Sequence, residues 1–288
     1  MVLPEGHNTI KIMKESFYHL TPAMLQQRLM EVEAHALTSS LLYNQIHKKG
    51  NLGDRFDASC GQQVSRRVQD WLLETFDFSL PTADQIHESE DGTVKFLYRM
   101  VDGSTVETVL LPFQGKYSLC VSSQVGCAMN CSFCFTGTQG LKRHLESHEI
   151  VGQFLMSRDW LKKNRPDGGK ILNVVFMGQG EPLHNFDAVK VSCEILISQH
   201  GASLADHKIT VSTSGYLPGL KRWQSEMPQV NLALSLHSAF EDKRSTLIPI
   251  NVKYPLDEVM VYLDALPLDK KRFITYEYLL LDGFNDGE

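Results

Sequence analysis

Three cysteines lie within one short segment, Cys127-Ala-Met-Asn-Cys131-Ser-Phe-Cys134. Thiolates at the spacing C-x3-C-x2-C can hold three irons of a [4Fe–4S] cluster, which leaves the fourth iron open to a substrate or cofactor. The alternatives are incidental cysteines and structural zinc, but structural zinc normally takes four ligands in two pairs. The sequence has no second pair of cysteines. The spacing therefore predicts a cluster bound by Cys127, Cys131 and Cys134 in a reducing compartment.

Polar groups also follow three predicted strands. Gly180 would let a ligand approach the backbone closely, and the Glu181 carboxylate could pair with an ammonium group. Serine hydroxyls and an imidazole could bind the ribose and adenine of a nucleoside. Taken singly, each has a plainer interpretation as a turn, a helix cap or a structural histidine. The motifs are Met177-Gly-Gln-Gly-Glu181-Pro, Thr210-Val-Ser212-Thr-Ser214-Gly215 and Ser235-Leu-His237.

Strands and helices alternate along the second half of the chain, which predicts βαβ units and a parallel sheet. The working residues of such folds lie at the C-terminal ends of the strands, so we expect the motifs to meet there. Five strands favour an α/β fold with an incomplete (β/α) barrel over a closed one. The predicted strands are 118–123, 171–177, 208–213, 231–236 and 272–281, with helices at 149–163 and 186–200.

The preceding residues have a different pattern. We predict a helical accessory domain over residues 1–92, a β-hairpin connector over 93–116 around the turn Asp102-Gly103, and the partial barrel over 117–288. The accessory helices are expected at 21–32 and 60–76. Their basic residues form either a solvated face or an RNA contact. These residues are Lys48, Lys49, Arg55, Arg66 and Arg67.

Composition sets weaker limits on function. The net charge of −6 over 288 residues argues against a surface that is basic throughout, but a local basic face remains possible. The chain begins without an apolar signal region and contains no apolar run long enough for a bilayer span. We therefore expect a cytoplasmic protein, with no membrane partner and no sign of more than a monomer.

The cluster spacing is that of radical S-adenosylmethionine enzymes, and the wider set of motifs resembles the RlmN/Cfr family of RNA methyltransferases. The resemblance rests on Cys120-Val-Ser-Ser-Gln-Val-Gly-Cys127, the cluster loop and the three strand-end motifs, and extends to Ile248-Pro-Ile-Asn251 and Leu281-Asp-Gly-Phe-Asn-Asp286. It implies a [4Fe–4S] cluster and S-adenosyl-L-methionine as cofactors. The implied cofactor-binding residues are Gly180, Glu181, Ser212, Ser235, Leu236 and His237.

The resemblance also implies an activity. Family members methylate C2 or C8 of an adenine in 23S rRNA, and RlmN types also act on tRNA, by way of a methylated cysteine and an adenosyl radical. By position, Cys120 would resolve the protein–RNA adduct and Glu107 would accept a proton, although a buried strand cysteine and a solvated glutamate are the plainer interpretations. Lys142 and Arg143 are candidate phosphate contacts or a solvated loop. Reduction would need a cellular electron donor such as flavodoxin or ferredoxin.

One part of the family pattern is missing from the sequence as written. The family's methyl-carrying cysteine lies in a Cys-Gly-Gln segment downstream of the motif that ends this sequence, so we expect a C-terminally truncated chain. Asp57-Ala-Ser-Cys60-Gly-Gln resembles that segment, either by coincidence or as a relocated methyl carrier. An adenine C2 methyltransferase is our first hypothesis. The alternatives are a Cfr-type C8 methyltransferase, an inactive RNA-binding paralogue, or a radical enzyme acting on a small substrate.

Overall fold

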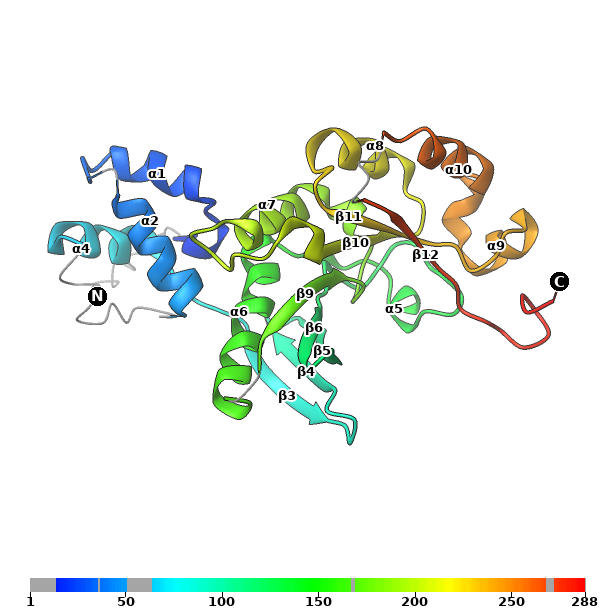
Figure 1. The fold of residues 1–288 in the computed structure, drawn as a ribbon, viewed down its shortest axis with the longest axis horizontal. Coiled ribbons are helices and arrows are strands. Elements are labelled where there is room, and N and C mark those ends of the chain that lie inside the picture. Colours follow the sequence, from blue (N-terminus) through cyan, green and yellow to red (C-terminus); the bar gives the residue numbers. More distant parts are fainter. Residues whose placement is uncertain (1–13, 36, 51–63, 167–168, 268–271, 288) are drawn as a thin grey trace, which may run out of the picture.

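The computed structural model describes residues 14–35, 37–50, 64–166, 169–267 and 272–287. Its centre is an eight-stranded sheet with the order β12-β11-β10-β9-β6-β5-β4-β3, shown in Figure 1. The strands of this sheet are β3 (Thr82–Glu88), β4 (Val94–Arg99), β5 (Thr105–Phe113), β6 (Lys116–Cys120), β9 (Ile171–Phe176), β10 (Ile209–Thr213), β11 (Asn231–Ser235) and β12 (Ile274–Glu277).

The strands β6, β9, β10, β11 and β12 are paired in parallel, each with its neighbour in the sheet. They are the five strands that the sequence predicts, although β12 pairs over a shorter stretch than the predicted 272–281. The sheet has two edges, β12 and β3. The prediction of an α/β fold with an incomplete barrel is therefore confirmed.

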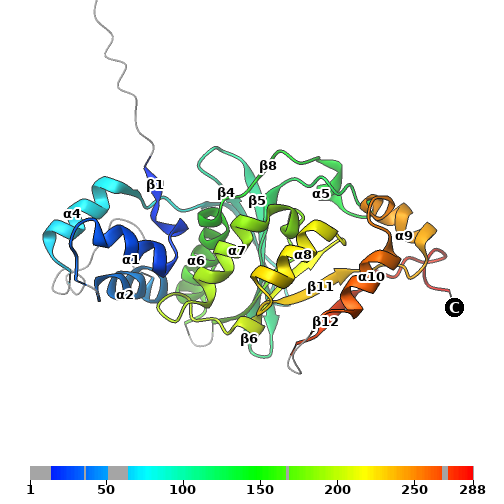
Figure 2. The same cartoon turned by 90° about the horizontal axis from the view of Figure 1, so that it is seen from above.

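The long helices cover one face of this sheet. Figure 2 shows α6, α7, α8 and α10 side by side in front of the strands. None of the described helices combines the length and the apolar composition that a membrane crossing requires. The helices of this region are α6 (Ser147–Asn164), α7 (Phe186–Ile197), α8 (Leu217–Glu226), α9 (Glu241–Leu247) and α10 (Leu256–Asp264), with the short α5 (Phe135–Thr138) and the 3-10 turns Pro182–Asn185, Asp206–Lys208 and Pro249–Val252.

The two faces of the sheet differ in chemistry because successive side chains point to opposite sides of a strand. Leu119, Val174 and Val211 are buried on the face toward the helices. The strand register places Cys120 level with Val175, and Ser235 level with Glu277, on the other face. We call this second side the inner face; it carries the polar and reactive groups.

The predicted hairpin is present, with Gly103 at φ +84 in its turn, but it is not a separate connector. It continues the sheet through β5–β6 pairing and gains a third antiparallel strand, β3, on its other side. The prediction that residues 1–92 are helical is wrong for Thr82–Glu88. All seven side chains of β3 are exposed, so the strand has no apolar alternation that the sequence could reveal.

The accessory helices form the end of the molecule opposite α9 and α10 (Figures 1 and 2). They dock on α6 through polar contacts: His19 Nδ1 lies 2.6 Å from Ser147 Oγ, and Lys162 Nζ donates to the Lys49 carbonyl at 3.0 Å. The predicted Cys60 and Arg55 lie outside the described residues. The accessory elements are α1 (Pro22–Met30), α2 (Thr38–Tyr43), the π-helical turn Asn44–Lys49, α4 (Arg66–Thr75), the 3-10 turn Phe17–His19, and the paired strands β1 (Glu15–Ser16) and β2 (Phe76–Asp77).

A fully buried amide connects α6 to the sheet. Gln153 Oε1 accepts hydrogen bonds from Thr108 Oγ1 at 2.7 Å and from the Ser122 N–H at 2.9 Å. Its Nε2 donates to the Ser122 carbonyl at 3.0 Å. Thr108 belongs to β5, whereas Ser122 follows β6, so one side chain holds the hairpin and the start of the cluster loop against the same helix.

Gln153→Leu should lower the free energy of unfolding by at least about 2 kcal/mol, because each buried partner left without a hydrogen bond costs about 1–3 kcal/mol. Urea denaturation followed by circular dichroism would measure the loss. Gln27→Leu, at an exposed position on α1, is the matched control and should change stability by less than about 0.5 kcal/mol. Equal stability of the two variants would contradict a structural role for the Gln153 amide.

Candidate cofactor and active site

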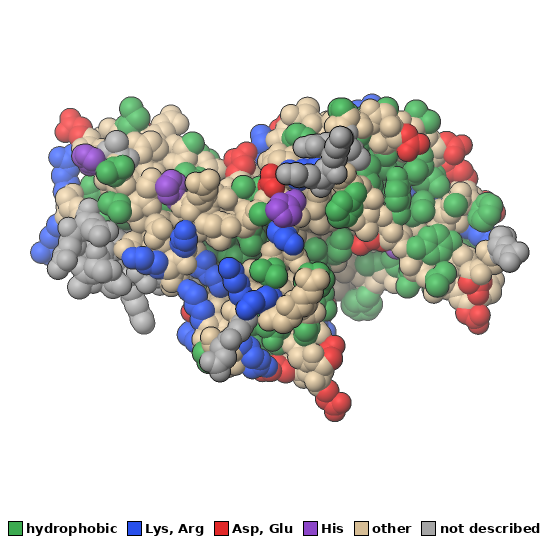
Figure 3. All heavy atoms as spheres, viewed as in Figure 1, with side chains coloured by type: hydrophobic (Ala, Val, Ile, Leu, Met, Phe, Trp, Pro, Cys, Tyr) green, Lys and Arg blue, Asp and Glu red, His purple; other side chains and the backbone are tan. Residues whose placement is uncertain are grey.

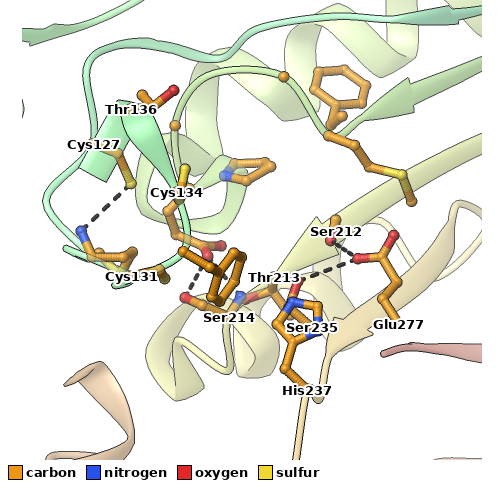
Figure 4. A pocket seen from close by; sticks show the side chains of 18 of the residues that line it. Cys127, Cys131, Cys134, Thr136, Ser212, Thr213, Ser214, Ser235, His237 and Glu277 are labelled. Atoms are coloured by element: carbon orange, nitrogen blue, oxygen red, sulfur yellow. Dashed lines mark hydrogen bonds between the residues drawn. The ribbon is translucent and has the colours of Figure 1, made fainter. Parts of the chain in front are cut away.

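A hollow of about 390 Å³ opens at the C-terminal ends of the parallel strands and is seen from close by in Figure 4. It brings together eight of the predicted residues, which come from four separate segments of the chain. Leu236, a further predicted residue, does not line it. The predicted residues that do are Cys127, Cys131, Cys134, Gly180, Glu181, Ser212, Ser235 and His237.

The cluster loop is held at both of its ends. Before it, β7 (Gln124–Val125) pairs with β8 (Arg143–His144), which follows the loop. Gly126, at φ +76, passes so close that an added Cβ would lie 1.8 Å from the Gly140 carbonyl oxygen, and only glycine fits there. The loop is also tied to the far side of the barrel, because the Ser132 N–H donates to the Leu247 carbonyl at 2.9 Å.

The surroundings of the loop disfavour the charged form of its thiols. Burial, together with smaller contributions from the neighbouring thiols and Glu181, raises the pKa of Cys127 to about 11 and that of Cys131 to about 12. Both thiols therefore keep their protons at neutral pH until a metal displaces them. Among the described residues, no three His, Cys, Asp or Glu side chains converge on one point as a mononuclear site requires. The three cysteine side chains line one hollow, and thiolates are the ligands that iron–sulfur clusters take.

Glu181 is the most deeply buried acidic group of this hollow, with an exposed fraction of 3%. One of its oxygens, Oε2, accepts from the N–H and the hydroxyl of Ser214, each at 2.8 Å. The other, Oε1, accepts from the Leu183 N–H at 3.1 Å. Burial raises its pKa above the usual range, and these hydrogen bonds oppose the rise. An ammonium group entering the hollow would supply a counter-charge that none of these hydrogen-bond donors provides.

Ser212 and Ser235 share a partner that the sequence analysis missed. Both hydroxyls donate to Glu277 Oε2, at 2.8 Å and 3.2 Å, as Figure 4 shows. Glu277 is the last residue of β12, so it satisfies the same strand-end criterion as the predicted residues. Its carboxylate fixes both serine side chains and adds an acceptor for ligand hydroxyl groups.

His237 has a defined orientation and protonation state. Its Nδ1 accepts a hydrogen bond from the Leu279 N–H at 3.0 Å, and the ring meets Phe133 edge to face at 4.6 Å. Burial lowers the pKa of His237, so the ring is neutral and carries its proton on Nε2. The residue has φ +53, and Asn285 Nδ2 donates to its carbonyl at 2.6 Å, which connects the predicted Leu281–Asp286 motif to the site.

A second residue missed by the sequence analysis is Arg244, whose exposed fraction is 0%. Its guanidinium donates to the carbonyls of Ser214, Ser235 and Leu236 at 2.9, 3.0 and 3.2 Å, and also to Asn251 Oδ1. Burial lowers the pKa of Arg244 to about 10, so the group stays charged at neutral pH. One buried cation thus clamps the chain just after β10 to the end of β11.

Cys120 and Glu107 lie outside the hollow but share the inner face of the sheet. Cys120 is level with Val109, two residues along β5 from Glu107. Burial raises the pKa of Cys120 to about 11, so its thiol is protonated at neutral pH. Glu107 Oε1 pairs with Lys95 Nζ at 3.0 Å, which holds the carboxylate on this face.

The two candidate phosphate contacts have different surroundings. Arg143 forms a bidentate pair with Glu149 at 2.7 and 2.8 Å and also binds Asp102 at 2.7 Å. It connects the hairpin turn to the start of α6, so its prediction as a phosphate contact is not supported. Lys142 is exposed and forms no ion pair with any described residue.

Comparison with known proteins agrees with this geometry. The family model described as "Radical SAM superfamily" matches residues 121–288. The chain therefore belongs to the radical SAM superfamily. A crystal structure of a radical SAM methyltransferase from Sphaerobacter thermophilus superposes with a TM-score of 0.81 at 33% identity, over 95% of this chain and 79% of that one.

Curated relatives narrow the assignment. A protein from Sorangium cellulosum named "Dual-specificity RNA methyltransferase RlmN" is 38% identical over 286 residues, covering 87% of this chain and 72% of the relative. A protein of the same name from Desulfotalea psychrophila is 44% identical over 207 residues, covering 70% of this chain and 57% of the relative. Within the superfamily, the chain belongs to the RlmN family.

Arg244→Lys should lower the free energy of unfolding by about 2–4 kcal/mol, because a lysine cannot reach the four acceptors that the planar guanidinium bridges. Arg222→Lys is the matched control, since Arg222 pairs with Glu226 and Asp187 at the surface. That change should cost less than about 1 kcal/mol. Urea titrations of both variants would compare them, and equal losses would show that Arg244 does not clamp the strand ends.

Proposed function

We propose that this protein methylates C2 of an adenine in 23S rRNA and in tRNA, using S-adenosyl-L-methionine and a [4Fe–4S] cluster. The observation that carries the proposal is the single hollow that holds three cysteines on one side and the strand-end polar residues on the other. The names of the RlmN relatives support RNA as the substrate. The chain spans 57–72% of the length of those two relatives. The activity of the whole protein is therefore part of what we propose.

Cys127, Cys131 and Cys134 would hold the cluster, and Glu181 would pair with the amino group of the cofactor. Gly180, at φ +106, lets the cofactor approach the backbone beside Glu181. When bound, cluster and cofactor supply the radical that is needed because an aromatic C–H carbon is a poor nucleophile.

The other end of the cofactor would lie along β10 and β11. Ser212 and Ser235, oriented by Glu277, offer hydroxyl groups to its ribose. The neutral His237 offers an Nε2–H donor beside the aromatic edge of Phe133. Leu236 would contribute through its backbone, whose N–H donates to the Glu277 carbonyl at 2.9 Å and thereby sets the position of the next residue.

Cys120 and Glu107 would act on the target base from the inner face. The Cys120 thiol becomes a nucleophile only if an acceptor removes its proton, because its pKa lies near 11. Glu107 lies on the same face and is the proposed proton acceptor of the reaction. The target base would have to leave its stack to reach this face, so a loop or a distorted helix is the expected form of the RNA.

The accessory domain would contribute affinity for the RNA. Lys48, Lys49, Arg66 and Arg67 are exposed on or beside its helices, as the basic-face prediction requires. Figure 3 shows Lys and Arg side chains gathered from this end of the molecule across α6. Their charges are local, so they are compatible with a net charge of −6 over the whole chain.

Glu181→Gln should weaken binding of S-adenosylhomocysteine about tenfold or more, because a hydrogen bond to a charged group is worth about 1.5–3 kcal/mol. In the unmodified protein the affinity should fall as pH falls through the raised pKa of Glu181, because protonation removes the charge that pairs with the ammonium group. Titration calorimetry at several pH values would measure both effects. Glu194→Gln, at an exposed position on α7, is the control and should bind S-adenosylhomocysteine as the unmodified protein does. A Glu181→Gln variant with the same pH dependence as the unmodified protein would exclude this role.

Expression of the protein together with the family's methyl-carrying Cys-Gly-Gln segment, in cells that lack an adenine C2 methyltransferase, should restore 2-methyladenosine in rRNA and tRNA, measured by mass spectrometry of digested RNA. Cys127→Ala should reduce the signal to background, because only two of the three proposed cluster ligands would remain. Cys193→Ala, on the buried face of α7, is the control and should leave the 2-methyladenosine signal unchanged. A signal at 8-methyladenosine would assign C8 chemistry instead, and soluble, cluster-loaded protein without product would contradict the proposal.

A further inference from the structure

A second hollow lies beside the first, between the hairpin and the cluster loop. It measures about 730 Å³, and we call it the hairpin hollow. Thr136 lines both hollows, and the Gly-Gln-Gly turn separates them: Gly178 and Gly180 line the first hollow, whereas Gln179 lines the hairpin hollow. A flat ligand in the hairpin hollow would therefore lie next to one that reacts at the cofactor.

An exposed aromatic ring lines the hairpin hollow. Phe135 follows the last cluster cysteine, and its exposed fraction is 79%. Its backbone is fixed, because the Phe135 carbonyl accepts from Thr138 Oγ1 at 2.7 Å and the Gly137 N–H donates to the Cys134 carbonyl at 3.0 Å. An exposed ring on a rigid turn is a platform on which a nucleobase can stack. Phe133, two residues earlier, is already in contact with His237.

Gln179, whose side-chain oxygen is unpartnered, also lines the hairpin hollow. The backbone of Gln179 is held by hydrogen bonds to Ser122 and from Ser123 and Gln124, at 2.8–3.1 Å. Ser122 in turn donates to the Glu107 carbonyl at 2.6 Å. The side-chain Oε1 of Gln179 is buried and accepts no hydrogen bond from the described residues. Rotation of this side chain into the hairpin hollow would bring the oxygen to an exocyclic amine of a nucleobase, which is a donor that can satisfy it.

The charges around the hairpin hollow leave one cation available among the described residues that line it. Arg99 pairs with Asp84 at 2.6 Å, and Lys95 pairs with Glu107 at 3.0 Å. Lys142, which also lines the hairpin hollow, is exposed and forms no ion pair with any described residue. An ammonium group beside a stacking platform matches the phosphate that accompanies each base of an RNA.

We propose that the hairpin hollow binds the nucleotide next to the methylated adenine: Phe135 stacks on its base, Gln179 accepts from its exocyclic amine, and Lys142 contacts its phosphate. This inference rests on the proposed function, because it needs an RNA whose target base lies at the cofactor. An aromatic face, a lone acceptor and a free cation are the three groups that a single amine-bearing nucleotide would use. Docking of an electron-donor protein is the competing possibility, and the test below separates the two.

The decisive measurement is the affinity of cluster-loaded protein with S-adenosylhomocysteine for a short RNA hairpin that carries the target adenine, by fluorescence anisotropy. Phe135→Leu should weaken binding roughly 5- to 150-fold, the range for loss of one stacked base. Phe135→Tyr should restore it. Phe113→Leu is the matched control, because Phe113 is an exposed aromatic residue that does not line the hairpin hollow. Replacing the neighbouring nucleotide with an abasic residue should remove the difference between the unmodified protein and the Phe135→Leu variant.

Two further variants test the remaining contacts. Gln179→Leu should abolish the preference for adenine or cytosine over uracil at the neighbouring position. Lys142→Gln should reduce the slope of log affinity against log salt by about 0.7, the value for one phosphate contact with a single strand.

The outcomes are distinct. If Phe135→Leu weakens binding equally for intact and abasic RNA, or leaves it unchanged, the nucleotide site is excluded. If the variant binds RNA normally but slows reduction of the cluster by flavodoxin, the hairpin hollow is a donor surface and our inference is wrong. If the unmodified protein neither binds the RNA nor methylates it, the proposed function itself fails. Normal binding and methylation by the unmodified protein, with unaffected variants, would overturn this inference alone.

Discussion

Parallel pairing of five strands is the constraint on which the site depends. Because each strand returns to the same edge through a helix, residues more than a hundred positions apart end at one edge of the sheet. Cys120, Thr213 and Ser235 end or nearly end their strands at that edge. The cluster loop follows β6, the first of these strands in the chain, and Glu277 is the last residue of β12. The helices that bury the opposite face leave the inner face free for chemistry.

Buried and partly buried polar side chains then fix the relative positions that strand pairing alone does not determine. Gln153 joins the hairpin and the segment after β6 to α6, Arg143 joins the hairpin turn to the start of that helix, and Arg244 clamps the chain after β10 to the end of β11. Each uses several hydrogen bonds, so the cost of burying a polar group is offset only in one arrangement. Such residues restrict the strand ends to a single relative position, and a cofactor-binding surface needs that precision.

The same burial tunes the chemistry of the site. It raises the pKa values of Cys127 and Cys131, so these thiols remain protonated until metal arrives, and it keeps His237 neutral with a defined donor. It also leaves Glu181 without a charged partner among its hydrogen-bond donors, which are the Ser214 and Leu183 groups. The hollow thus combines three thiols with a carboxylate that a cationic group could neutralise.

Sequence alone determined the features that depend on local spacing. The C-x3-C-x2-C loop, the five apolar strands and the Asp102-Gly103 turn could be predicted because thiol spacing, apolar runs and glycine at positive φ are properties of neighbouring residues. Tertiary structure alone decided the rest. It revealed that the exposed residues of β3 form a strand by pairing with β4. It also revealed Arg244, whose four acceptors come from distant segments. It also placed Arg143 in an ion-pair network with Asp102 and Glu149, and set Gln179 and Phe135 around a second hollow. These contacts depend on which segments the fold brings together, and a linear sequence does not contain those distances.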